Sequence, residues 1–268
     1  MTNFQRRALT ATVFAAVMLV GLFWNELSFT ALFLVISIGC QWEFLKLTVE
    51  KSVIRYGLAL LIGIAVFAIN SFFLETIKHY FLVLFPLILL TPIAELFLKS
   101  EKPFQNMALI FFSLFYPCLS VAFSVSNDLT IWHEGFTPNI VFGILLLTWA
   151  NDSFAYIIGS RIGKTPLFPR ISPKKTWEGT IGGAIMCILT GLGIYYFLGI
   201  LSLTDWLVIG GIVAVFGTLG DLIESMLKRS VGVKDSGSFM PGHGGFLDRF
   251  DAFIFALPFV YLYLLVAR

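Results

Sequence analysis

Apolar residues fill nine long runs along this chain, and short polar connections separate the runs. A helix needs about 20 mostly apolar residues to cross the hydrocarbon core of a bilayer, and each run reaches or approaches that length. We therefore expect an all-α, polytopic integral membrane protein with about nine transmembrane helices. The predicted spans lie near residues 8–25, 27–45, 56–74, 80–98, 104–124, 139–158, 180–200, 206–224 and 250–267.

The composition supports a membrane protein and excludes several other classes. The 268 residues are 58% hydrophobic and 13% charged, whereas soluble domains are about 45–50% apolar and about 25% charged. A soluble globular enzyme, a disordered chain and a disulfide scaffold are thereby excluded. The three cysteines lie far apart in apolar runs and form no metal or redox motif. A net charge of +2 gives no indication of nucleic-acid binding.

The distribution of lysine and arginine predicts the orientation in the membrane. If the N-terminus is cytoplasmic, 16 of the 18 cationic residues fall on the cytoplasmic side, and only Lys78 and Arg268 fall outside. Cytoplasmic loops carry such an excess of cations. We therefore expect the N-terminus inside and the C-terminus outside. The first apolar run lacks a small-x-small cleavage pattern, which favours a retained span.

One integral domain, residues 1–268, is the simplest organisation, with two functional halves. Residues 1–147 contain no polar grouping that suggests chemistry, and we interpret them as a scaffold that contributes dimer contacts or a lipid cavity. Residues 148–268 form the expected catalytic half, with two cytoplasmic loops at 159–179 and 225–251.

Carboxylates inside or beside the predicted spans of the second half are the main candidates for chemistry. An ionised side chain at the centre of a spanning helix costs about 3 kcal/mol on insertion scales, and it is a functional hypothesis by default. In the predicted orientation all of these carboxylates fall in cytoplasmic halves of spans, so they can converge on one cavity open to the cytosol. They are Asp152, Asp221, Glu224, Asp248 and Asp251.

Simple pairing with a nearby cation is the alternative for each carboxylate. It accounts for Glu224, which has Lys228 one turn away. It accounts less well for Asp152 and Asp221, which have no basic neighbour at that spacing. Clustered carboxylate and hydroxyl oxygens favour Mg²⁺ over zinc.

The two cytoplasmic loops combine cations, hydroxyls and glycines. The first loop offers phosphate-binding groups, although a cationic anchor for anionic lipid is an alternative. In the second loop, glycines 242, 244 and 245 allow close backbone approach to a ligand, although a tight turn is again an alternative. The polar residues concerned are Ser172, Lys174, Lys175 and Thr176 in the first loop, and Ser225, Lys228, Arg229, Lys234, His243 and Arg249 in the second. Cations beside carboxylates are what phosphoryl or nucleotidyl transfer requires.

The order of these residues closely resembles the signature of the phosphatidate cytidylyltransferases, also called CDP-diacylglycerol synthases. Residues 225–251 follow the pattern S-x-apolar-K-R-x4-K-D-x-G and then P-G-H-G-G-x-x-D-R-x-D, with Met240 where the family has Leu, Ile or Phe. Residues 171–179, Asn151-Asp152-Ser153 and Gly220-Asp221 also match. The specific resemblance covers residues 148–252.

The resemblance implies a Mg²⁺-dependent enzyme, with a second cation as an option, that makes CDP-diacylglycerol and pyrophosphate from CTP and phosphatidate in bacterial phospholipid synthesis. It also implies a homodimer in the cell inner membrane with its active site facing the cytosol. On this basis Asp221 and Asp248 are the first candidates for metal ligands, with Asp251, Asp152 and Glu224 as further ones. Lys228, Arg229 and Lys234 would act with them in catalysis, and His243 would order the glycine loop or contact a phosphate rather than act as a base. The residues assigned to substrate are Ser172, Lys174, Lys175, Thr176, Ser225, His243 and Arg249.

Two other functions are compatible with parts of this pattern. A CTP-dependent lipid kinase of the dolichol-kinase type would transfer the γ-phosphoryl group, and its products would distinguish it. An ion or proton transporter would use intramembrane carboxylates, but it predicts polar residues in both halves of the chain rather than in one.

Overall fold

The computed structural model describes residues 3–72, 77–132, 135–239 and 244–267, and these form two compact units. Unit 1 comprises Met1–Asn127 with Asp235–Arg249, and unit 2 comprises Asp128–Lys234 with Phe250–Arg268. Residues 235–239 and 244–249 of the predicted second loop therefore cluster with the N-terminal helices, and the division into a scaffold half and a catalytic half stays a prediction.

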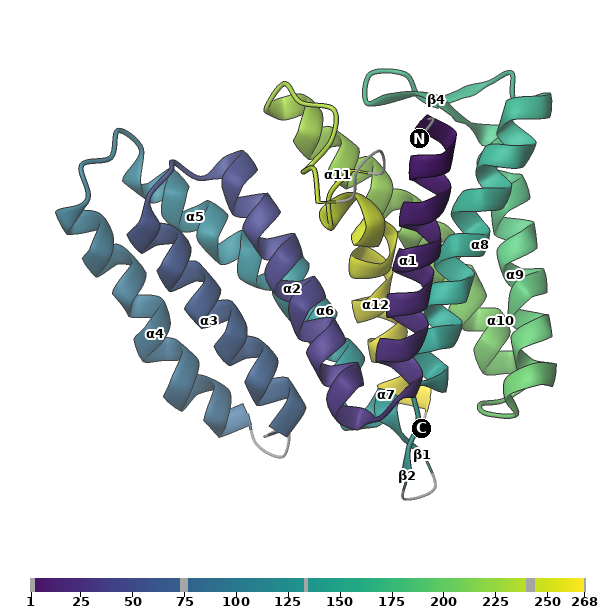
Figure 1. The fold of residues 1–268 in the computed structure, drawn as a ribbon, viewed down its shortest axis with the longest axis horizontal. Helices are drawn as coiled ribbons and strands as arrows, with labels where there is room; N and C mark the ends of the chain where they lie inside the picture. The colour runs from purple at the N-terminus through teal and green to yellow at the C-terminus, as the bar shows by residue number, and fades with distance from the viewer. Residues whose placement is uncertain (1–2, 73–76, 133–134, 240–243, 268) are drawn as a thin grey trace. The chain divides into compact units, whose positions relative to one another are not determined.

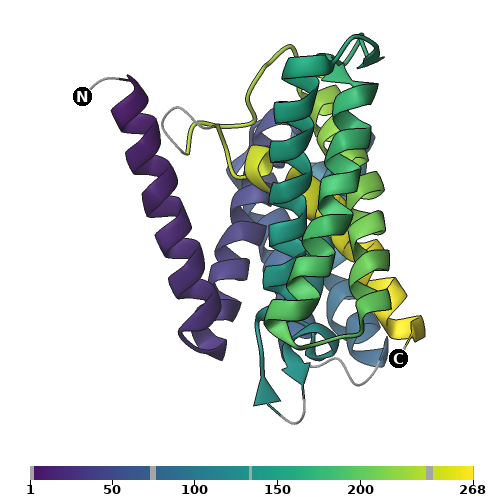
Figure 2. The ribbon, with the colours of Figure 1, turned by 90° about the vertical axis from the view of Figure 1, so that its right-hand side faces the viewer.

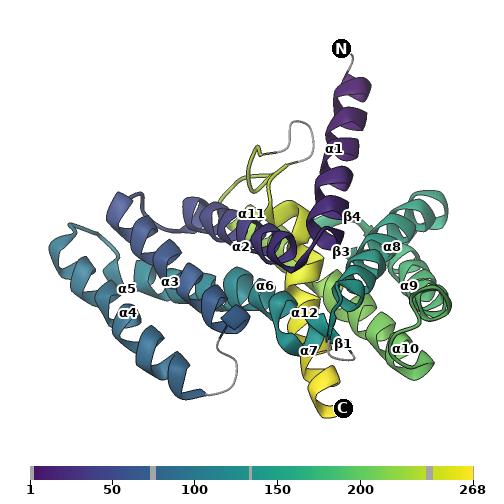
Figure 3. The same cartoon turned by 60° about the horizontal axis from the view of Figure 1, so that its bottom comes forward.

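Unit 1 is built from helices, of which α2, α3 and α4 lie side by side (Figure 1). Helix α1 contacts α2 near their connection and then runs away from it (Figure 3). The helices are α1 (Asn3–Phe23), α2 (Glu26–Thr48), α3 (Val53–Phe72), α4 (Ile77–Phe97), α5 (Pro103–Ser113) and α6 (Ser120–Ala122), with a π-helical turn at Leu114–Leu119 and a 3-10 turn at Phe123–Val125.

Unit 2 places α8 and α9 side by side, with short hairpins at the two ends of α8 (Figure 2). Its elements are α7 (Asn127–Thr130), β1 (Ile131–Trp132), β2 (Gly135–Phe136), α8 (Asn139–Ile162), β3 (Pro166–Phe168), β4 (Ser172–Thr176), α9 (Trp177–Leu198), α10 (Leu203–Ile212), a π-helical turn at Val213–Gly217, α11 (Thr218–Ser230) and α12 (Leu247–Ala267). Both hairpins are antiparallel. Helix α12 begins in the last residues of unit 1 and continues into unit 2.

Each predicted span coincides with a helical segment, which confirms the all-α, polytopic fold class. Within the described residues, seven segments are long and apolar enough to cross a membrane. The other two, α1 and α4, contain shorter apolar stretches at Leu9–Phe23 and Leu84–Phe97. Nine crossings, and the sides on which the termini lie, stay predictions.

Local sequence explains where the first two helices separate. The Asn25 side chain accepts a hydrogen bond from the Ser28 backbone N–H at 2.8 Å, and the Ser28 hydroxyl lies 3.0 Å from the Asn25 N–H. This reciprocal capping box satisfies backbone donors at the start of α2. Two polar residues, Asn25 and Glu26, are therefore enough to end one helix and begin the next.

A buried ion pair joins α3 to α4 in unit 1. The Arg55 and Glu95 side chains are only 5% and 4% exposed, and Arg55 Nη2 donates to Glu95 Oε2 at 2.9 Å. A second guanidinium nitrogen, Nε, donates to Oε1 of the same carboxylate. The bidentate geometry compensates for the cost of removing both charges from water.

Glycines allow α8 and α9 to approach closely in unit 2. A Cβ atom at Gly179 would lie 2.7 Å from the Ala155 carbonyl oxygen, and one at Gly183 would lie 2.8 Å from the Asn151 carbonyl oxygen. Small residues four positions apart are typical of close helix packing in membranes. The close packing places the start of α9, with the β3–β4 hairpin before it, directly against α8.

We expect Arg55→Ala to lower the free energy of unfolding by about 3–5 kcal/mol, because it leaves the Glu95 carboxylate buried without its partner. Replacing both members by apolar residues of similar size, Arg55→Met with Glu95→Leu, should recover most of the loss. Thermal unfolding of the detergent-solubilised protein measures both effects. A double variant as unstable as Arg55→Ala would contradict this explanation.

Candidate active site

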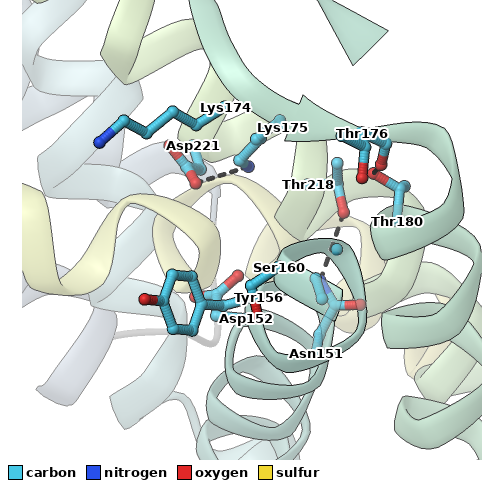
Figure 4. A pocket seen from close by; sticks show the side chains of 12 residues that line it. Asn151, Asp152, Tyr156, Ser160, Lys174, Lys175, Thr176, Thr180, Thr218 and Asp221 are labelled. Carbon is cyan, nitrogen blue, oxygen red and sulfur yellow. Dashed lines mark hydrogen bonds and ion pairs between the residues drawn. The ribbon is translucent and has the colours of Figure 1, made fainter. Parts of the chain in front are cut away.

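Unit 2 contains a cavity of about 450 Å³, which is within the range of small-molecule sites. It lies where α8, β4, the first turn of α9 and α11 meet (Figure 4). Its lining is mostly polar side chains and small residues: Asn151, Asp152, Ala155, Tyr156, Gly159, Ser160, Lys174, Lys175, Thr176, Thr180, Thr218 and Asp221.

Two consecutive lysines of β4 supply positive charge to this cavity. Lys175 Nζ pairs with Asp221 Oδ2 at 2.5 Å, and both side chains are partly buried. The exposed side chain of Lys174 points in a different direction from that of Lys175 (Figure 4). Alternation along a strand explains this divergence. Both residues were predicted to bind substrate, and the structure brings both to the cavity.

Thr176 and Thr180, at the start of α9, line one side of the cavity with their hydroxyl groups, and local hydrogen bonds hold this segment in place. The Thr176 side chain accepts a hydrogen bond from the Gly179 N–H at 3.2 Å and so caps the helix. Glu178 accepts from the backbone N–H groups of Lys164 and Thr165 at 3.1 Å, which holds the hairpin in place. These hydrogen bonds fix the backbone of the predicted loop 159–179 at residues 164–165 and 176–179.

Two lining residues without a predicted role, Asn151 and Thr218, form the buried wall. Asn151 Nδ2 donates to Thr218 Oγ1 at 3.3 Å, and the Thr218 hydroxyl donates to the Ala214 carbonyl at 2.8 Å. Asn151 belongs to the motif that carries the family resemblance. Thr218 follows the π-helical turn at Val213–Gly217, and such turns occur frequently at functional sites.

Three carboxylates converge beside the cavity. One oxygen each from Asp221, Glu224 and Asp251 lies within 4.8 Å of the others. Asp221 and Glu224 share a face of α11 because they are three residues apart, and Asp251 lies on α12. The backbones approach closely here, since a Cβ at Gly220 would lie 2.6 Å from the Asp251 carbonyl oxygen. All three residues were predicted metal ligands.

Neighbouring side chains balance this negative charge. Lys228 forms an ion pair with Glu224, whose side chain is fully buried, and the Ser225 hydroxyl donates to Asp221 Oδ1 at 3.2 Å. Carboxylate oxygens are the ligands that Mg²⁺ prefers, at about 2.0–2.1 Å. Oxygens on one such ion are therefore separated by about 4 Å or less, so small side-chain rotations would let the cluster hold a divalent cation.

The other predicted residues of unit 2 occupy more peripheral positions. Asp152 is exposed and lines the cavity from α8. Ser172 lies on β4 but is not among the described residues that line the cavity. Arg229 and Lys234 are exposed, and Arg229 donates to the Val233 carbonyl at 3.1 Å.

The remaining predicted residues belong to unit 1. Asp248 Oδ2 accepts hydrogen bonds from the Ser236 N–H at 2.9 Å and from the Gly245 N–H at 2.8 Å, and the Ser236 hydroxyl oxygen lies 2.9 Å from it. Arg249 is exposed. His243 lies outside the described residues.

One residue of this loop region was missed from the sequence. Glu43 of α2 is 6% exposed, and its carboxylate accepts hydrogen bonds from the Ser236 hydroxyl and the Leu247 N–H, both at 2.9 Å. A carboxylate inside the predicted span 27–45 is itself a signal of function. Glu43 is the only carboxylate in its predicted span, so the sequence shows no group of acidic residues there.

Comparison with known proteins shows which family and which relatives this chain is similar to. A sequence profile of the cytidylyltransferase family matches residues 5–267. The phosphatidate cytidylyltransferase of Bacillus subtilis (strain 168) is 34% identical over 274 residues, which cover 98% of each chain. The proteins of that name from Staphylococcus aureus (strain COL) and Staphylococcus haemolyticus are 47% and 48% identical over 122 residues, which cover 45% of this chain and 46% of each relative.

We expect Mg²⁺ to raise the Tm of the purified protein and the increase to be lost in Asp251→Asn. A ligand at 100 times its dissociation constant stabilises the native state by about 2.7 kcal/mol, and this variant removes one charged ligand. Asp205→Asn is the matched control, because Asp205 is a carboxylate of unit 2 that accepts hydrogen bonds from Ser202 and Tyr263 instead. Equal Mg²⁺-dependent increases in the two variants would show that the cluster does not bind the ion.

Proposed function

This chain belongs to the cytidylyltransferase family, and we propose that it transfers the cytidylyl group of CTP to phosphatidate, giving CDP-diacylglycerol and pyrophosphate. The observation that carries this proposal is the cavity in which Lys174 and Lys175 lie beside Asp221 and the carboxylate cluster. The cavity combines cations for phosphate groups with oxygens for a divalent cation. The Bacillus subtilis relative, whose match covers 98% of this chain, carries the name phosphatidate cytidylyltransferase.

The proposed reaction needs no nucleophile from the protein. A phosphate oxygen of phosphatidate attacks the α-phosphorus of CTP, and the bond to pyrophosphate breaks on the opposite side. The chief task of the enzyme is to hold two polyanions together, so positioning and charge neutralisation account for most of the acceleration. Lys174 and Lys175 would bind phosphate oxygens, and Lys175 would exchange its contact with Asp221 for one with substrate.

The residues fit Mg²⁺ as the cofactor, and the cluster of Asp221, Glu224 and Asp251 would hold it. When bound, Mg²⁺ neutralises charge on the phosphates and the leaving pyrophosphate. Lys228 pairs with Glu224 inside the unit, and the Ser225 hydroxyl orients Asp221. Asp152 would extend the oxygen set from α8, and Asp248 keeps the metal-binding role that the family resemblance implies for it.

The remaining site residues keep supporting roles in this proposal. Ser172, Thr176, Arg229, Lys234 and Arg249 would bind phosphate groups or order the two loops, and His243 would order the glycine loop. We further propose a homodimer, as the family resemblance implies. The cation distribution supports an inner-membrane location with the site facing the cytosol, where CTP is available.

We expect the purified full-length protein, given CTP labelled in the cytidine and phosphatidate, to form labelled CDP-diacylglycerol and one pyrophosphate for each lipid product. A lipid kinase would instead release CDP and form a new lipid phosphate. Thin-layer separation of the lipids together with a pyrophosphate assay distinguishes the two. Formation of CDP without labelled lipid would reject cytidylyl transfer.

We expect Asp221→Asn and Asp248→Asn to lower the rate of product formation by about 100-fold or more, because each removes a negative charge that serves the ion or the loop. Activity is measured across a Mg²⁺ titration. Asp128→Asn is the control, since Asp128 accepts a hydrogen bond from Tyr261 outside the cavity lining. Near-wild-type rates at low Mg²⁺ would remove either aspartate from the proposed site.

A further inference from the structure

The second loop is anchored to α2 by one buried carboxylate, Glu43. Its Oε2 atom accepts hydrogen bonds from the Ser236 hydroxyl and from the Leu247 N–H, both at 2.9 Å. Ser236 lies within this loop and Leu247 is the first residue of α12. A single side chain from the N-terminal half therefore contacts the loop at two positions 11 residues apart, and all the residues concerned belong to unit 1.

The loop backbone is shaped to fit this carboxylate. A Cβ atom at Gly237 or at Gly245 would overlap the carboxylate oxygens of Glu43. The absence of a side chain at both positions therefore leaves the space that the Glu43 carboxylate occupies. Burying an ionised carboxylate is costly unless donors satisfy it, and the loop supplies those donors.

Ser236 links Glu43 to Asp248. Its hydroxyl oxygen lies 2.9 Å from Glu43 Oε2 and 2.9 Å from Asp248 Oδ2. A hydroxyl carries one proton, so it donates to one of these carboxylates at a time. The Asp248 carboxylate also accepts from the Ser236 and Gly245 N–H groups. Ser236 and Gly245, which both lie against Glu43, therefore also hold the Asp248 side chain in position.

We propose that Glu43 is a positioning residue that acts through Ser236 to hold Asp248 in its working orientation. The proposal rests on the function proposed above, in which Asp248 serves the reaction. It assigns a specific role in the chemistry to the N-terminal half, which otherwise contributes apolar helices. Partners that orient a ligating side chain typically change metal affinity or activity by about 10–100-fold when they are removed.

Hydrogen–deuterium exchange on the full-length protein in detergent tests the positioning step without relying on activity. We expect Glu43→Ala to accelerate exchange at the Ser236, Gly245 and Leu247 amides, because the loop loses its anchor. Glu43→Gln should retain part of the protection, since its amide oxygen still accepts from Leu247. Glu95→Gln is the matched control: it alters another buried glutamate of unit 1, whose partner is Arg55 and not the loop.

Steady-state kinetics of the same variants test whether the loop affects the reaction. We expect Glu43→Ala to lower kcat by about 10–100-fold and to raise the Mg²⁺ concentration needed for half-maximal rate, with Glu43→Gln intermediate. Glu95→Gln should lower Tm without changing the Mg²⁺ dependence. If Glu43 acts through Ser236, the effects of Glu43→Gln and Ser236→Ala will not add in the double variant.

Different results reject different proposals. Unchanged amide exchange and unchanged Mg²⁺ dependence in Glu43→Ala would overturn the positioning role, and if that variant does not fold, the same result in Glu43→Gln would do so. Additive effects of Glu43→Gln and Ser236→Ala would reject the route through Ser236. A wild-type protein that forms no CDP-diacylglycerol would reject the proposed function, and with it the catalytic part of this inference, whatever the exchange data show.

Discussion

A charge inside an apolar helical protein needs a partner in the protein, because neither lipid nor packed side chains can solvate it. Among the described residues, each of the three buried glutamates meets that requirement through a different contact. Glu95 pairs with the Arg55 guanidinium, Glu224 pairs with Lys228, and Glu43 receives a hydroxyl and a backbone N–H from the second loop. The Arg55–Glu95 pair joins α3 to α4 and the Glu43 contacts join α2 to the second loop, so these two charges help select how apolar helices pack, whereas the Glu224–Lys228 pair lies within α11.

The same need for a partner also applies to the charges of the proposed active site. Asp221, Glu224 and Asp251 together would repel one another without positive charge, and Lys175 and Lys228 supply it. Phosphate groups and a divalent cation can replace these internal ion pairs without leaving a charge uncompensated. A site assembled in this way is suited to two polyanionic substrates, and close packing of α8 on α9 through glycines holds its walls in place.

Much of the fold could be predicted from local patterns. Apolar runs located the nine helical segments, and the polar pair Asn25-Glu26 was sufficient to separate the first two because Asn25 and Ser28 form a capping box. The spacing of Asp221 and Glu224 placed both on one face of a helix, and the order of polar residues between 148 and 252 indicated the family. By contrast, Glu43 was missed, since its partners lie about 200 positions further along the chain.

The sequence by itself determined the helices, the family and the residue types available for chemistry, because apolar length, capping and motif order are properties of neighbouring residues. Only the tertiary structure decided which of those residues meet. In the tertiary structure Asp251 lies close to Asp221 and Glu224, and Lys175 forms an ion pair with Asp221. Glu43 of α2 hydrogen-bonds to the second loop. These contacts join segments distant in the chain, and they depend on how closely helix backbones approach, which a linear pattern does not specify.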